Sequence, residues 1–262
     1  DSIGYVRTHQ FRYEEVEFTV SVYQEKETQY PTIFEEIIRC IYLTSRLPIN
    51  KDPVQEIIIH LFMADVPKQI EQGQPIGKNT CNSGSTLFYI EPSMPRTISI
   101  WRQEEFRKVL IHELIHAFSY DEKSEETCFD GINSLLINQF KLQGNINVNE
   151  AYTEFLAVLI HIFIVITSCS QVNTITQKQL VKYYYELLYY ELIYSMMTMI
   201  RILHNFGITS VTNFFLQPEL QNKLFIQDTS IFSYYFLKTY YLFLFLQQPN
   251  TQLSSKLLFT KQ

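Results

Sequence analysis

Two histidines four residues apart constrain the conformation of their segment more than any other feature of this sequence. His112 and His116 enclose Glu113 in an H-E-x-x-H pattern. On an α-helix, side chains four residues apart share one face, about 5–6 Å apart at their Cβ atoms. Apolar residues recur at helical spacing on the opposite side: Phe106, Leu110, Leu114 and Ala117. The segment is therefore predicted to be a helix that buries one face and presents both histidines on the other.

The chemistry of this face points to a metal ion. Two imidazoles on one helical face can bind a single Zn²⁺ at N–Zn distances of about 2.0–2.1 Å. Glu113 directly follows His112, so it flanks such an ion without binding it and can take a proton from a metal-activated water. A catalytic zinc usually keeps three protein ligands and one open position. A third ligand is therefore expected elsewhere in the chain.

A pair of carboxylates opens a later apolar segment. Glu150 and Glu154 stand four residues apart, immediately before the apolar residues 155–163. Like charges at this spacing repel, and burial at the start of an apolar helix raises the cost unless a cation neutralises them. A zinc ion bound by two neutral imidazoles supplies that cation. Either carboxylate is then a candidate for the third ligand.

The combined set of residues resembles the gluzincin metallopeptidases. In this resemblance, His112, Glu113 and His116 form the zinc helix, and Glu150 and Glu154 lie on the downstream helix. It implies that Glu150 is the third zinc ligand and that Glu154 hydrogen-bonds a ligand histidine. The interval from His116 to Glu150 is longer than in compact gluzincins, and Glu replaces the commoner Asp at the second acidic position. Glu154 therefore stays open as the alternative ligand.

A looser resemblance extends over residues 55–245. It is similar to an uncharacterised metallopeptidase family of large DNA viruses, on the residues 82–86, 98–105, 108–113, 149–154 and 234–238. This resemblance implies a viral origin, and it makes other viral proteins possible partners. It implies no particular substrate.

Five other side chains could contribute to such a site. Asp121, five residues after the motif, could be a ligand in another H-E-x-x-H subclass, although an acidic residue after a helix is commonly solvated. His161 lies in an apolar run, where a histidine is commonly a hydrogen-bonded core residue. His204, Tyr120 and Tyr152 could donate to an oxyanion. For these three, structural or surface roles are the simpler interpretation.

Composition excludes several classes of function. The net charge is −6 and no cluster of Lys or Arg stands out, so nucleic-acid binding is not expected. The apolar residues 155–169 are fewer than the roughly 20 that span a membrane, so they predict a buried helix and no membrane span. No signal segment is visible at the start, which favours an intracellular or virion-associated protein. The cysteines are widely spaced and are expected to be free, buried thiols: Cys40, Cys81, Cys128 and Cys169.

The order of the patterns predicts an α+β fold. Residues 1–30 are expected to form a strand hairpin or an extended lead, with a half-buried strand at 13–22. A helix is expected to begin near Pro31. Further strands are expected at residues 57–63, 86–90 and 97–101. A small mixed sheet then precedes the zinc helix, and the C-terminal half is mostly helical, which is the zincin-like arrangement that the resemblance implies.

The predicted organisation is one catalytic unit made of two parts. Residues 1–101 form the α+β part with the sheet, residues 102–262 form the helical part that carries the zinc site, and the cleft lies between them. Residues 86–90 or 97–101 are expected to form an edge strand that pairs with an extended peptide substrate.

The sequence thus predicts a zinc metallopeptidase that acts on protein or peptide substrates. Its catalytic residue is Glu113 and its metal ligands are His112, His116 and Glu150. The alternative is a non-catalytic structural or virion-associated protein built on the same zincin-like fold, since a fold does not guarantee its usual chemistry.

Overall fold

The chain has an α+β fold, as predicted, with a sheet in its N-terminal part and a mostly helical C-terminal half. The contacts within the chain divide it into two compact units. The first comprises Asp1–Gln69 and Asn82–Lys123, and the second comprises Ile70–Cys81 and Ser124–Gln262. The computed structural model describes residues 4–27, 31–48, 54–65, 67–68, 76–77, 81–88, 94–121, 126–144, 146–169, 175–217, 225–227 and 229–248.

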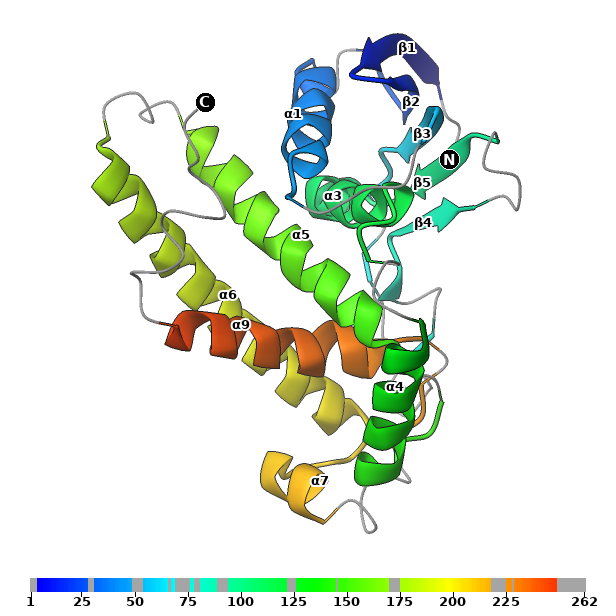
Figure 1. Ribbon diagram of the computed structural model, residues 1–262. Helices are drawn as coiled ribbons and strands as arrows, with labels where there is room; N and C mark the ends of the chain where they lie inside the picture. The colour runs from blue at the N-terminus through cyan, green and yellow to red at the C-terminus, as the bar shows by residue number, and fades with distance from the viewer. Residues whose placement is uncertain are drawn as a thin grey trace. The chain divides into compact units, whose positions relative to one another are not determined.

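The first unit is built on a five-stranded mixed sheet in the order β1-β2-β3-β5-β4 (Figure 1). The strands are β1 Tyr5–Tyr13, β2 Val16–Gln24, β3 Glu56–Phe62, β4 Gly84–Leu87 and β5 Arg96–Ile100. Strands β2, β3 and β5 are parallel, whereas β1 and β4 are antiparallel to their neighbours. The predicted mixed sheet and hairpin are therefore confirmed.

The hairpin turn falls inside the strand predicted at residues 13–22. Tyr13 pairs with Val16, and Glu14 adopts a left-handed conformation with φ 53°. Glu14 and Glu15 thus form a two-residue turn, and β2 starts only at Val16. The sequence hides this turn because such positions usually carry Gly, Asn or Asp.

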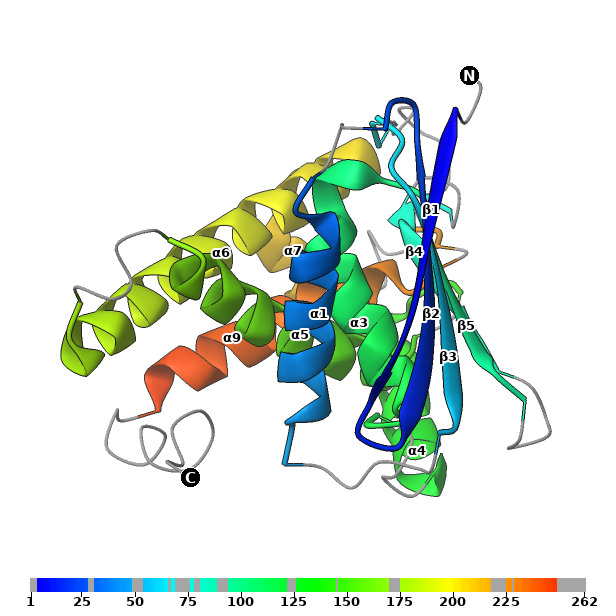
Figure 2. The same cartoon turned by 90° about the horizontal axis from the view of Figure 1, so that it is seen from above.

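Two helices cover one face of this sheet. The helices α1 (Ile33–Ser45) and α3 (Phe106–Ala117) lie on the same side of the strands (Figure 2), and the short helix η1 (Gln103–Glu105) leads directly into α3. Alternate strand residues are buried, as the period of a β-strand dictates. They are Val16, Phe18, Val20 and Val22 of β2, Ile57, Ile59 and Leu61 of β3, and Ile98 and Ile100 of β5.

The helix α3 belongs to the same unit as the sheet, whereas the sequence-based division placed it with the later helices. The reason is its packing. Leu110 and Leu114 are fully buried, and α3 contacts α1, β4 and β5. An apolar helix next in sequence to a central strand thus buries its face on the sheet that it follows.

The second unit is helical. Its elements are α4 Glu126–Phe140, α5 Val148–Thr167, α6 Gln177–Asn205, α7 Val211–Leu216, the π-helix η4 Phe232–Leu237 and α9 Lys238–Gln247. One cluster of buried apolar residues joins α5, α6 and α9, with Val158, Leu188 and Leu242 among its members. A capping box of Thr176 and Gln179 begins α6.

The helix α5 is the apolar helix predicted over residues 155–169, and it begins earlier. Among the described residues it alone is long and apolar enough to cross a membrane, with a mean hydropathy of 1.7. Of its most apolar stretch, 56% is buried inside the protein. A buried core helix accounts for that composition, which is consistent with the predicted absence of a membrane span.

Three cysteines are described, and all three are free thiols, as predicted. Cys40 and Cys81 are buried, whereas Cys169 is exposed at the end of α5, so the expected burial is wrong there. Burial raises the pKa of the Cys40 thiol to about 12. The side chain of Cys128 lies outside the described residues.

Candidate metal centre

The H-E-x-x-H segment forms a helix, as predicted. Residues outside the predicted apolar face of this helix are buried as well. Besides Leu110 and Leu114, the side chains of Ile111 and Ile115 are fully buried. His112 is also almost enclosed, with 7% of its surface exposed. A polar side chain in such a place needs a partner, because an unsatisfied buried donor or acceptor costs about 1–3 kcal/mol.

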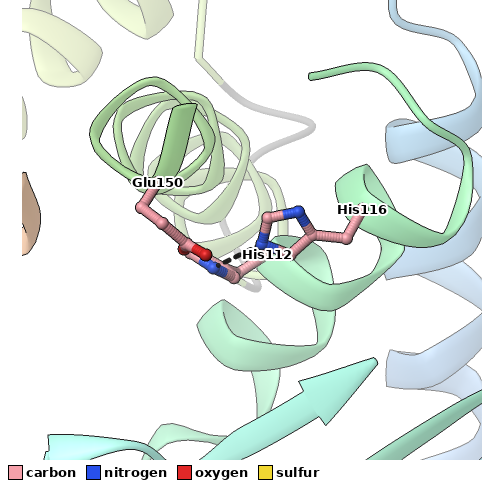
Figure 3. Close-up of side chains that lie close together, drawn as sticks. All are labelled: His112, His116 and Glu150. Atoms are coloured by element: carbon pink, nitrogen blue, oxygen red, sulfur yellow. Dashed lines mark hydrogen bonds between the residues drawn. The ribbon is translucent and has the colours of Figure 1, made fainter. Parts of the chain in front are cut away.

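The two histidines turn their Nε2 atoms toward each other. The Nε2 atoms of His112 and His116 are 3.0 Å apart (Figure 3), and the ring planes cross at 71°. Two nitrogens bound to one tetrahedral zinc at about 2.0–2.1 Å would be separated by roughly 3.3 Å. The spacing of these two nitrogens is therefore close to what a shared metal ion requires.

The other nitrogen of His116 is held by a carboxylate. Asp121 places its Oδ2 atom 2.6 Å from the Nδ1 atom of His116, and only 7% of Asp121 is exposed. A carboxylate at this distance accepts the Nδ1 proton and leaves the lone pair on Nε2. This contact fixes the orientation of the imidazole. The expectation that Asp121 is solvated is wrong, because its carboxylate is buried and contacts the predicted ligand His116.

The end of α3 explains how Asp121 returns to the helix. Ser119 has φ 55°, and the N–H groups of Ser119 and Tyr120 donate to the carbonyls of His116 and Ile115. These two bonds form a Schellman motif, which reverses the chain direction after the last helical turn. Arg96 of β5 donates to the Ala117 carbonyl and, at 2.8 Å, to the Ser119 hydroxyl. The sheet thus fixes the turn that delivers Asp121.

Glu113 is held from the side of the sheet. The hydroxyl of Thr86 on β4 lies 2.7 Å from Oε2 of Glu113 and 3.1 Å from its main-chain carbonyl. Gly84, two residues earlier, faces the same side chain: a Cβ atom there would lie 2.9 Å from Oε1 of Glu113. Glu113 is 7% exposed. Its carboxylate is therefore a fixed group rather than a solvated one.

Glu150 and Glu154 lie on α5, in the second unit. The side chain of Asn147 accepts the N–H of Asn149 and begins the helix, which puts Glu150 in the first turn. A negative charge is favoured there by the helix dipole. Glu154 follows one turn later and is 8% exposed. Figure 3 draws Glu150 together with His112 and His116 of α3. The two imidazoles offer ring nitrogens and Glu150 offers a carboxylate oxygen, which are atoms that can bind a metal ion.

The remaining candidates have other surroundings. The hydroxyl of Tyr120 donates to the Ser45 carbonyl at 3.1 Å, which ties the turn after α3 to the end of α1. Burial raises the pKa of Tyr120 to about 12. Tyr152 is half-buried on α5, and burial raises its pKa. His161 is half-buried on α5, and His204 is exposed at the end of α6. A role for Tyr152 or His204 in binding an oxyanion remains a prediction.

The two strands expected to bind substrate occupy different places in the sheet. β5 lies between β3 and β4, so its hydrogen-bonding groups are used by its neighbours, and the expectation for residues 97–101 is wrong. β4 pairs only with β5 among the described strands and forms an edge. It begins two residues before the predicted range 86–90, of which residues 89 and 90 lie outside the described residues.

Comparison with known proteins gives one partial similarity. The chain is 34% identical over 92 residues to the uncharacterised protein R210 of Acanthamoeba polyphaga mimivirus. The matched residues make up 33% of this chain and 22% of that protein. No protein-family model matches the chain, and no solved structure matches it. The similarity agrees with the viral resemblance of the sequence at this coarse level.

Proposed function

We propose that this protein is a zinc-dependent metallopeptidase of the gluzincin type. One observation carries the proposal: the Nε2 atoms of His112 and His116 are 3.0 Å apart on one helix, while Asp121 holds Nδ1 of His116. Two nitrogens oriented in this way are suited to a shared cation. An imidazole with a carboxylate on its second nitrogen is the usual arrangement of a metal ligand.

The donor set fits zinc. His112 and His116 offer two imidazole nitrogens and Glu150 offers a carboxylate oxygen, a set that could hold a metal ion. Two histidines and one glutamate are also the ligands of known catalytic zinc sites with an open fourth position. In the proposal Glu150 is the third ligand, and Glu154, one turn further along α5, supports a ligand from the second sphere.

The catalytic role falls to Glu113. When bound, zinc supplies Lewis acidity, which polarises a carbonyl and lowers the pKa of a bound water to about 7. Glu113 accepts the proton of the attacking water and later gives it to the leaving amine. Asp121 keeps His116 in one tautomer, and Thr86 keeps the Glu113 carboxylate in place. These contacts preorganise the groups before the substrate arrives.

The proposed substrate is a peptide in extended conformation. β4 forms an edge of the sheet among the described strands, and its Thr86 directly contacts Glu113. A peptide added along this edge would form main-chain hydrogen bonds that tolerate many sequences. Its scissile bond would then run past the catalytic glutamate.

The proposed setting is viral. The partial similarity to a mimivirus protein supports a viral origin, with the protein inside infected cells or associated with virions. Other viral proteins are then the natural candidates for substrates and partners.

The test is Glu113→Gln, assayed with a library of quenched fluorescent peptides after loading with zinc. Because Gln cannot accept the proton, cleavage should fall by about 10²-fold or more. Zinc content should not change, since Glu113 is not a ligand in the proposal. Full cleavage by the variant would refute the assigned chemistry. A wild-type protein that takes up no zinc would favour the non-catalytic alternative.

A further inference from the structure

The edge strand β4 does more than border the sheet, because two of its residues contact the predicted general base. Thr86 donates its hydroxyl proton toward Oε2 of Glu113 at 2.7 Å, with the main-chain carbonyl of Glu113 at 3.1 Å from the same hydroxyl. The hydroxyl shares its one proton between the carboxylate and the carbonyl, and both acceptors belong to a residue of α3. The carboxylate is thereby tied to the same short strand that the helix packs on.

Gly84 completes this arrangement. Side chains two residues apart on a strand point to the same face, so position 84 faces α3 together with Thr86. A Cβ atom at Gly84 would lie 2.6 Å from Cγ1 of Val109, 2.9 Å from Oε1 of Glu113 and 3.1 Å from its Cγ. Real Cβ atoms essentially never approach other atoms to less than 3.0 Å, so the first two distances exclude a side chain without a shift of its neighbours. The missing side chain at Gly84 therefore makes room for the carboxylate beside β4.

We infer that Thr86 is a positioning residue for Glu113, because its hydroxyl holds Oε2 and thereby fixes the carboxylate beside β4. The inference rests on the proposed function. Thr86 holds Oε2, and the fixed carboxylate takes the proton. One O–H bond of the water breaks, an O–H bond forms on the carboxylate, and the electron pair stays on the water oxygen that attacks the carbonyl. Thr86 acts through Glu113 and does not touch the reacting atoms.

The assignment couples the base to the edge strand. A peptide that pairs with β4 would lie against the strand that fixes Glu113. Binding of the peptide and positioning of the base would then depend on the same four-residue strand. A loss of the Thr86 hydroxyl should therefore lower kcat and leave KM nearly unchanged, because main-chain pairing along β4 does not use the side chain. Zinc affinity should stay the same, because Thr86 contacts Glu113 rather than His112 or His116.

The experiment combines two readouts. In the zinc-loaded protein, Thr86→Val should lower kcat about 10-fold with KM within about 2-fold, a modest loss for a base that is misplaced by a fraction of an ångström. Thr86→Ser, which restores the hydroxyl, should recover most of the rate. Thr8→Val is the matched control, since it makes the same substitution on β1, which lies at the opposite edge of the sheet from β4.

The second readout needs no metal and no substrate. In the metal-free protein, Thr86→Val and Glu113→Met should each lower the urea midpoint, and the double variant should lose less than the sum because the two side chains interact. Additive losses would overturn the inference, as would a Thr86→Val enzyme with an unchanged kcat beside an inactive Glu113→Gln. A wild-type protein without any peptidase activity would overturn the proposed function and this inference with it.

Discussion

At the scale of single residues, the contact between Asp121 and His116 has the most direct consequence for metal binding. Asp121 lies five residues after His116, a spacing that by itself suggests either a ligand or a solvated acid. The left-handed Ser119 and its two main-chain hydrogen bonds turn the chain back, and the carboxylate then reaches Nδ1 at 2.6 Å. The sequence shows only an acidic residue just after the end of a helix. Its contact with His116 could be predicted only if the left-handed turn at Ser119 were known.

Removing this carboxylate should weaken zinc binding. Partners of ligand histidines typically contribute 10- to 100-fold in metal affinity, so Asp121→Asn should raise the Kd for zinc about 10-fold and Asp121→Ala nearer 100-fold. Competition with a chromogenic chelator measures both values. Asp130→Asn, at an exposed aspartate of α4, is the control and should leave the Kd unchanged. An unaltered Kd for Asp121→Ala would contradict the orienting role.

At the scale of elements, the sequence predicted helices and strands well where periodicity was strong. The motif helix, the helix after Pro31, the strand at residues 57–63 and the mixed sheet all follow from apolar spacing. It failed where tertiary contacts decide. The turn at Glu14 lacks the usual turn residues, and the inner position of β5 depends on which strand lies beside it, which no local pattern encodes.

The same distinction applies to the candidate site. His112, Glu113 and His116 could be predicted because one helix brings them together. Thr86 could not, because its contact with Glu113 joins residues 27 positions apart across the interface of β4 and α3. Long-range contacts of this kind need the sheet order, which periodicity does not supply.

The close packing of β4 on α3 predicts a cost for any side chain at Gly84. Gly84→Ala would bring a Cβ atom to 2.6 Å from Val109 and 2.9 Å from Glu113. Overpacking of this kind should destabilise the protein by about 1–3 kcal/mol in urea unfolding. Gly131→Ala is the matched control: it lies in α4 with nothing within 4 Å of its would-be Cβ atom, and it should stabilise by about 0.5–1 kcal/mol. Equal effects at both positions would be inconsistent with this packing.

At the scale of the whole molecule, the chain combines a sheet-based unit that carries the histidines with a helical unit held together by aromatic packing. The sequence contains 20 Phe and 18 Tyr. Composition alone does not tell whether these aromatic residues stack on a ligand or fill a core. In the helical unit the phenylalanines fill a core: the ring of Phe214 lies within 6.5 Å of Phe215, Phe225, Phe232 and Phe236.

This aromatic core predicts contrasting effects on the short helix α7. Phe214 is fully buried, whereas Leu216, two residues later, is 75% exposed. Phe214→Ala should cost about 3–5 kcal/mol because it leaves a cavity among the four rings. Leu216→Ala should stay within about 0.5 kcal/mol of wild type. Thermal and urea unfolding of the two variants compares them directly, and a severe loss in Leu216→Ala would contradict the assigned burial.

The central claim is that His112, His116 and Glu150 bind one catalytic zinc ion. Elemental analysis of the purified protein tests it most directly, with wild type, His116→Ala and Glu150→Gln measured side by side after dialysis against a weak chelator. The account predicts one zinc per wild-type chain, none in His116→Ala and a reduced content in Glu150→Gln. A wild-type protein that holds no zinc, and takes up none when zinc is offered, would contradict it.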